Sequence, residues 1–157
     1  MTLVLRRAGL AALLACTAAC SESWGNDNSA PVDITVTENA TSDLTLWVSN
    51  QSFVDRTVDV TVTLDGATII DRGFNVGDQH NFIEHRIRLH HGSHTLTAST
   101  VIDGEPVELS EEFTIDAGQQ HFAALTYSHY VPTRAGDTSF DPPGFNFLVQ
   151  DDPIGFA

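Results

Sequence analysis

The sequence predicts an all-β protein, folded as an antiparallel β-sandwich of about seven or eight short strands. From Val32 onward, apolar and polar residues alternate with a period of two, as in strands that are buried on one face. Turn signals rich in aspartate and glycine return about every 8 to 12 residues, which is typical of a sandwich. No stretch after residues 1–20 shows a helical period.

The alternation is clearest over 58–64, where valine and leucine alternate with aspartate and threonine. Asp65-Gly66 follows and predicts a two-residue hairpin turn, with the return strand over 68–74. An earlier strand over 44–49 alternates in the same way and has Trp47 on its polar face. These segments would form the first half of the sandwich.

The second half of the chain continues the pattern. Asp103-Gly104 predicts another hairpin. His85 shares an apolar face with its neighbours and would be a core histidine with satisfied hydrogen bonds. Glu111 falls on the apolar side of its strand and predicts a β-bulge or an exposed end. The strands expected here cover 81–89, 94–102, 107–115 and 119–130.

The N-terminal segment resembles a targeting signal. Two arginines precede the apolar stretch 8–15, which is shorter than the roughly 20 residues that a membrane span needs. Leu13-Leu14-Ala15-Cys16 resembles the bacterial lipoprotein signal, in which the chain is cut before a cysteine that then carries the lipid. We favour Cys16, with Cys20 as the alternative acceptor and an ordinary secretory signal as the alternative interpretation. The resemblance implies a lipid-anchored protein on the extracytoplasmic face of the cell membrane.

The expected organisation is a signal and lipobox region over 1–20, a flexible tether over 21–31 and one β-sandwich domain over 32–157. Proline and glycine interrupt the pattern over 131–144, which predicts a loop across one end of the sandwich. Large apolar residues then return with a period of two, so 145–157 would be a last strand or a docked segment.

Charge and cysteine content exclude several classes of function. The 157-residue chain has a formal charge of −14, and loss of Arg6 and Arg7 with the signal would take it to −16. Such a domain repels nucleic acid, so we expect no nucleic-acid partner. Both cysteines lie in the signal region, so the domain has no disulfide, no cysteine nucleophile and no thiolate metal site.

Histidines are the only residues that suggest site chemistry. His90, His91 and His94 lie around one predicted turn, and a hairpin there could present imidazoles to a metal ion. Against this, the chain has no His-x-His or His-Glu-x-x-His motif. It also lacks the nucleophile elbow, the P-loop and the dinucleotide fingerprint. We therefore expect no enzyme activity and no cofactor.

The segment Leu89–His94 resembles the corner that leads into the penultimate strand of immunoglobulin-like and fibronectin-like sandwiches, with His94 in the place of the corner aromatic. The whole chain is similar to uncharacterised bacterial lipoproteins that carry one such domain. The resemblance implies a fold and an address but no activity. We expect a non-catalytic binding or scaffolding role at the cell envelope, with an envelope protein or a polysaccharide as partner. The alternative is a metal-binding envelope protein that uses the turn at His90–His94, and a remote alternative is a small secreted hydrolase.

Overall fold

The computed structural model describes residues 34–37, 41–77 and 81–156, which belong to one compact unit, Pro31–Ala157. These residues form strands and no helix, so none of them provides a helix long and apolar enough to cross a membrane. The strands are β1 (Thr35–Thr37), β2 (Leu44–Asn50), β3 (Thr57–Leu64), β4 (Ala67–Asn75), β5 (Ile83–Arg88), β6 (Gly92–Ile102), β7 (Glu105–Ile115), β8 (His121–Tyr130) and β9 (Asp141–Gln150).

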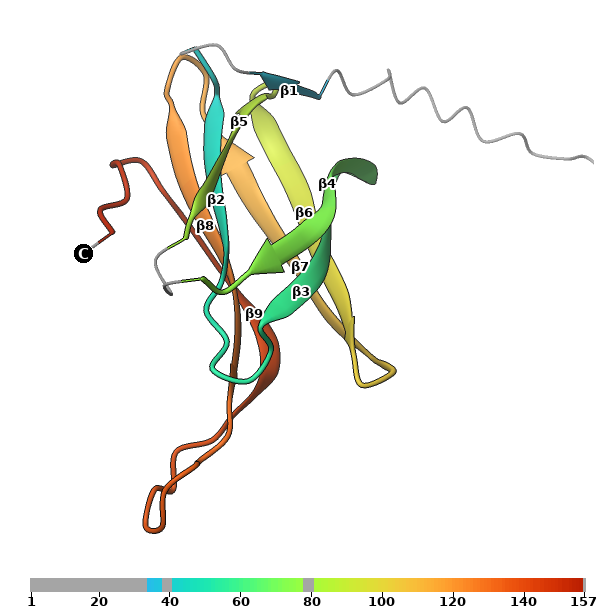
Figure 1. Cartoon of the computed structure of the whole chain (residues 1–157). Coiled ribbons are helices and arrows are strands. Elements are labelled where there is room, and N and C mark those ends of the chain that lie inside the picture. The colour runs from blue at the N-terminus through green and yellow to red at the C-terminus, as the bar shows by residue number, and fades with distance from the viewer. Residues whose placement is uncertain (1–33, 38–40, 78–80, 157) are drawn as a thin grey trace, which may run out of the picture. The chain divides into compact units, whose positions relative to one another are not determined.

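The strands form two sheets that face each other (Figure 1). The five-stranded sheet has the order β1-β5-β2-β8-β9, and the four-stranded sheet has the order β4-β3-β6-β7. Neighbouring strands are antiparallel except for β2 and β8, which run parallel along their whole contact. The prediction of an all-β sandwich is confirmed, whereas the expectation that every pair would be antiparallel is wrong for this central pair.

The core lies between the sheets, and the period-two alternation supplies it. Every second residue of β2, β3, β6 and β8 points inward and is buried, while the residues between them face outward. The largest fully buried side chains come from both sheets and include Tyr127, Phe74, Leu44, Leu46 and Leu96. Burial of one such side chain contributes about 1.5 to 3 kcal/mol.

Both hairpins that the Asp-Gly pairs predicted are present. Asp65 and Gly66 have φ values of 48° and 80°, and Asp103 and Gly104 have φ values of 53° and 87°. Two successive positive φ values define the type I′ turn, whose twist matches that of the flanking strands. The chain therefore reverses within two residues between β3 and β4, and again between β6 and β7.

The order of the strands differs from that of an immunoglobulin constant domain, in which strands A, B, E and D form one sheet and C, F and G the other. The segment Leu89–His94 was expected to lead into the penultimate strand, but it leads into β6. The likeness to immunoglobulin-like domains thus extends to the packing of two sheets and not to their connectivity. Strand alternation carries no information on which strands pair, so the local pattern could not reveal this.

Two strand details also differ from expectation. The pairing of β6 with β7 is regular through Glu111, which is exposed on an edge strand, and the bulge lies instead between Val62 and Thr63. β9 begins at Asp141, inside the expected loop 131–144. Pro142 and Pro143 are tolerated there because β9 is an edge strand, where a proline without an N–H leaves no ladder bond unmade.

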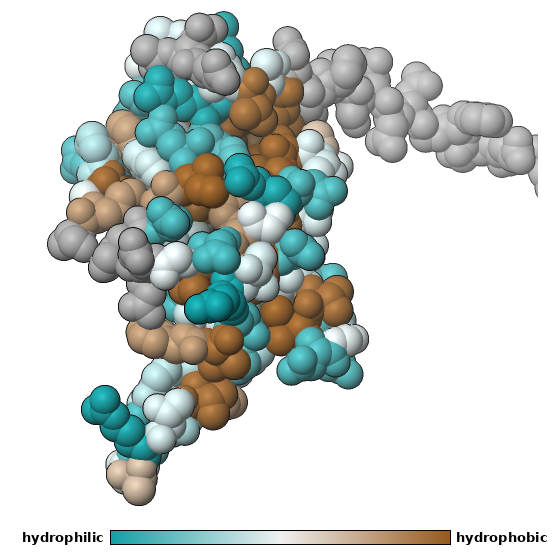
Figure 2. Space-filling view, in the orientation of Figure 1, coloured by the Kyte–Doolittle hydropathy of each residue, from teal (hydrophilic) through white to brown (hydrophobic). Residues whose placement is uncertain are grey.

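The β8–β9 hairpin extends beyond the sandwich, at the end opposite β1 (Figure 1). Val131 and Phe140 of the hairpin are exposed apolar side chains, and so is Phe53 in the neighbouring β2–β3 turn. Figure 2 shows brown, apolar atoms where this hairpin leaves the body. The ring of Phe53 packs edge-on against Tyr130 at 5.5 Å between centroids, which ties the hairpin to the β2–β3 turn.

The placement of β9 can be tested on its two faces. Phe147 packs against the core and its ring lies 5.7 Å from that of Phe113 in the opposite sheet, whereas Leu148 faces outward and is 53% exposed. We expect Phe147→Ala to lower the free energy of unfolding by about 2 kcal/mol, since Phe147 is only half-buried. The control Leu148→Ala should change it by less than about 1 kcal/mol. Equal losses in urea denaturation would show that β9 does not close the core.

Candidate functional site

The predicted histidine cluster is a structural contact. His94 is buried at the start of β6, and its Nδ1 lies 2.7 Å from Oδ2 of Asp65, in the β3–β4 turn. Its Nε2 lies 2.9 Å from the backbone oxygen of His90, and the two imidazole rings meet edge-on at 4.7 Å. His91 is exposed. The expected lipid acceptor Cys16 and its alternative Cys20 lie outside the described residues.

This arrangement does not favour a metal site. A histidine ligand needs a lone pair on a ring nitrogen, but both nitrogens of His94 face oxygen atoms that only accept hydrogen bonds. Among residues 34–37, 41–77 and 81–156, no group of three histidine, cysteine or acidic side chains could hold a metal ion. His94 instead joins the β5–β6 corner to the β3–β4 hairpin.

Two further histidines also pair with a distant aspartate. Nδ1 of His121 lies 3.0 Å from Oδ1 of Asp151, and its Nε2 accepts the backbone N–H of Asp116. Nδ1 of His129 lies 2.7 Å from Oδ2 of Asp55. Each pair holds a loop or the C-terminal segment against the end of a strand. His121 and His129 therefore stabilise the fold through these contacts.

The expectation for His85 was wrong. It is half-buried, and its Nε2 finds no hydrogen-bond partner among the described residues. Burial lowers the pKa of His85, and the nearby positive charge of Arg72 lowers it further. Both effects favour the neutral ring. Burial of a neutral ring without a hydrogen-bond partner costs less free energy than burial of a charged one.

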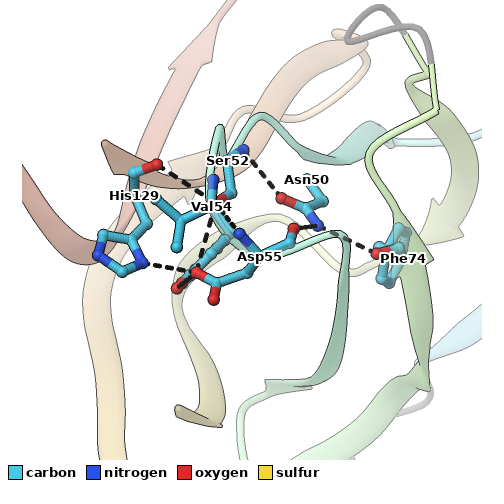
Figure 3. Close-up of polar contacts among 7 residues, drawn as sticks. Asn50, Ser52, Val54, Asp55, Phe74 and His129 are labelled. Atoms are coloured by element: carbon cyan, nitrogen blue, oxygen red, sulfur yellow. Dashed lines mark hydrogen bonds and ion pairs between the residues drawn. The ribbon is translucent and has the colours of Figure 1, made fainter. Parts of the chain in front are cut away.

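The densest polar network lies in the β2–β3 turn (Figure 3). Oδ2 of Asp55 accepts hydrogen bonds from the Tyr127 hydroxyl and from Nδ1 of His129, both at 2.7 Å. Ser52 Oγ accepts the backbone N–H groups of Val54 and Asp55 at 3.0 and 2.7 Å. The network thus fixes the turn to the end of β8.

Ser52, His129 and Asp55 are the three residue types of a hydrolase triad, but their arrangement is different. In a triad the imidazole stands between the serine and the carboxylate and takes the serine proton on its second nitrogen. Here Ser52 Oγ donates to the backbone oxygen of His129 at 3.2 Å and lies 3.3 Å from Oδ2 of Asp55 (Figure 3). The serine is 2% exposed and caps a turn. This geometry gives it no general base.

The feature that sequence analysis missed is a group of four aromatic rings on the outer face of the five-stranded sheet. We define the aromatic surface as Trp47, Phe82, Phe122 and Phe156. Trp47 of β2 and Phe122 of β8 lie nearly parallel, with centroids 6.0 Å apart. Phe156 packs edge-on against Trp47 at 5.5 Å and stacks on Phe82 at 3.8 Å. The rings come from four separate parts of the chain.

Two hollows flank the aromatic surface. One is polar and holds about 240 Å³; it is lined by Thr45, Trp47, Glu84, Arg86, Gln120 and Phe122. The other is apolar and holds about 300 Å³; its lining includes Phe82, Ala124, Leu148, Ile154 and Phe156. Sandwiches with one solvent-facing side normally carry polar residues outward, so large aromatics on this face are unusual and make it a candidate contact surface.

One signal in the sequence could have pointed to this surface. The alternation already placed Trp47 on the outward face of its strand, and a large aromatic among outward threonine and serine is an exception. Its partners were harder to find. Phe156 lies outside the strands, and Phe122 lies on a strand whose pairing was unknown. Phe82 lies just before β5, although the expected strand 81–89 included it.

The network at Asp55 predicts acid sensitivity. Burial raises the pKa of Asp55, but hydrogen bonds from Tyr127 and His129 lower it more, so the pKa lies below its ordinary value. A carboxylate with a lowered pKa stabilises the fold fully above the unfolded value and loses that effect as pH falls through the folded value. We expect the melting temperature to fall from about pH 4 to pH 2.

The variant Asp55→Asn should melt lower than wild type at pH 7 and depend less on pH in the acid range. Asp152→Asn, at an exposed position, is the matched control and should retain the wild-type slope. Thermal melts followed by circular dichroism measure both quantities. A wild-type slope in Asp55→Asn would contradict the role given to this carboxylate.

No protein-family model, curated protein or solved structure matches this chain. The fold is therefore described by its architecture alone, as a two-sheet all-β sandwich with one parallel pair at the centre of its larger sheet. The site is described by its geometry, and the aromatic surface with its two hollows is the feature that a binding role would use.

Proposed function

We propose that this chain is a lipid-anchored, extracytoplasmic binding module without catalytic activity, and that it binds at the cell envelope through the aromatic surface. The observation that carries the proposal is the position of Trp47 and Phe122 as neighbouring rings on the outward face of the central strands. Open aromatic faces bordered by polar residues are typical of recognition surfaces. The anchor rests on the signal at Leu13–Cys16.

Physical features of the described residues support a binding role over the two alternatives. The metal-binding alternative depends on His94, whose two ring nitrogens already face protein oxygens. The hydrolase alternative gains no support from Ser52, which is engaged with backbone groups and Asp55 and has no general base. The aromatic surface, by contrast, is accessible to a ligand: Phe156 is 41% exposed, and the partly exposed Trp47 and Phe122 line an open hollow.

A pelleting assay tests the binding role. The full chain with Cys16→Ala and Cys20→Ala, which removes the lipid, is mixed with isolated cell envelopes and sedimented. We expect it to co-sediment, and Trp47→Ala to weaken the apparent affinity about tenfold, as a central aromatic contact does. The matched control is Val101→Ala, because Val101 is 66% exposed on the other sheet.

The control should bind like the parent chain. If Trp47→Ala and Val101→Ala co-sediment equally well, the aromatic surface is not the binding face and the proposal fails. Circular dichroism of both variants establishes that the comparison is made between folded chains.

Anchoring is tested separately in cells. Cys16→Ala should release the protein from the membrane fraction, because the acyl chains that hold it are lost. Cys20→Ala should leave it in the membrane fraction and serves as the matched control. Release by Cys20→Ala alone would assign the lipid to the alternative cysteine, and retention in the double variant would contradict the lipoprotein interpretation.

A further inference from the structure

We infer that the polar hollow beside Trp47 binds one sugar unit of a neutral glycan, with the apolar face of the sugar against the side chains of Trp47 and Phe122. The inference rests on the proposed function and names the class of its ligand. Four properties of the hollow carry it, namely its shape, its aromatic wall, its polar groups and its charge.

The shape follows from the strand register. Thr45 of β2 pairs with Arg86 of β5 on one side and with Phe122 of β8 on the other. The small Thr45 side chain is 4% exposed and forms the floor between two large neighbours. The next row places Glu84 beside Trp47, so longer side chains surround the floor. The register of β5, β2 and β8 thus produces the hollow.

The aromatic wall suits the apolar face of a sugar ring. Trp47 and Phe122 stack on each other, with 15° between their planes, and both side chains line the hollow. A pyranose ring carries several C–H groups on one face, and these pack on an aromatic ring whose face is negative and whose body is apolar. The hydroxyl groups of the sugar then point sideways, toward the rim of the hollow.

The rim provides planar polar groups that are already oriented. Nε2 of Gln120 donates to the hydroxyls of Ser42 and Thr45 at 3.2 and 3.1 Å, which positions its amide oxygen as an acceptor for a ligand hydroxyl. Nε of Arg86 pairs with Glu84 on the same face of β5, and the remaining guanidinium N–H groups are donors. Preorganised groups of this kind lower the entropic cost of binding.

The charge of the site selects against ions. Glu84 and Arg86 form a pair, so the hollow itself is close to neutral. The chain around it has a formal charge of −14, which repels anionic polymers at low salt. An uncharged ligand that is rich in hydroxyl groups is not repelled by the negative charge of the chain. It also buries no unpaired charge when it binds.

The size restricts the ligand to a single unit at this site. The polar hollow holds about 240 Å³, below the range of about 300 to 1,000 Å³ that is typical of pockets for whole drug-sized ligands. An open hollow of this size on a sheet face accepts one ring of a longer chain, whose neighbouring units lie over the adjoining surface. Affinity for a short oligosaccharide should accordingly be weak.

The two tryptophans of the chain give an internal control for the experiment, because Trp24 lies in the expected tether and Trp47 in the hollow. The full chain with Cys16→Ala and Cys20→Ala is labelled with ¹⁵N, and the two indole N–H signals are assigned with Trp24→Phe. Hexasaccharides of glucose and of N-acetylglucosamine are titrated to about 10 mM, sufficient to detect a millimolar Kd. Oligogalacturonate is the anionic counterpart.

We expect at least one neutral hexasaccharide to shift the Trp47 indole signal progressively while the Trp24 signal stays in place, and oligogalacturonate to shift neither. Isothermal titration should show affinity reduced about tenfold by Trp47→Ala and severalfold by Gln120→Ala, with Val101→Ala unchanged. Gln120→Ala keeps the test valid if Trp47→Ala fails to fold, since Gln120 is exposed.

Three results would overturn the inference: no shift with any neutral sugar, an equal shift with the anionic one, or a Trp47 shift that depends on protein concentration alone. The last result would assign the face to a second copy of the chain. If Trp47-dependent pelleting with envelopes persists while no sugar binds, the proposed binding role stands and only the ligand class is wrong. If pelleting does not depend on Trp47, the proposed function itself fails.

Discussion

The parallel contact between β2 and β8 determines most of what is distinctive in this structure. It places two strands with fully buried inner faces at the centre of the larger sheet. Because the strands run in the same direction, both end at the same edge of the sandwich. The turn after β2 therefore meets the end of β8, where Asp55 accepts hydrogen bonds from Tyr127 and His129. The same register places Trp47 diagonally beside Phe122 on the outer face.

Local structure could be predicted from the sequence because its causes are local. Alternation over 58–64 reports burial on one face, and Asp65-Gly66 adopts the two positive φ values that a tight hairpin requires. Pairing has other causes. Leu44 and His121 are partners although they lie far apart in the chain, and the alternation of the two strands does not indicate that they pair. The start of β9 was missed because Pro142 and Pro143 are typical of loops unless the strand lies at an edge.

In the candidate site, too, local features could be predicted from the sequence and contacts between distant residues could not. The histidines around residue 90 suggested chemistry because their spacing is visible in the sequence, yet His94 is satisfied by Asp65, which lies on another hairpin. The aromatic surface was only hinted at by the outward-facing Trp47, because only the assembled sheet brings Trp47, Phe122 and Phe156 together. Both the histidine–aspartate contacts and the aromatic surface join residues that are distant in sequence, so neither could be predicted from local spacing.

The long connection between β2 and β8 also determines when this domain can fold. Leu44 has its β8 partner at His121, so one side of β2 stays unpaired until nearly the whole chain has been synthesised. Contacts of such large sequence separation slow folding, since the entropy of closing the loop is lost before the pairing is gained. Until then the unpaired backbone N–H and C=O groups on that side of β2 are open to association with other chains. This topology thus requires that the unpaired side of β2 be protected from other chains until β8 can pair with it.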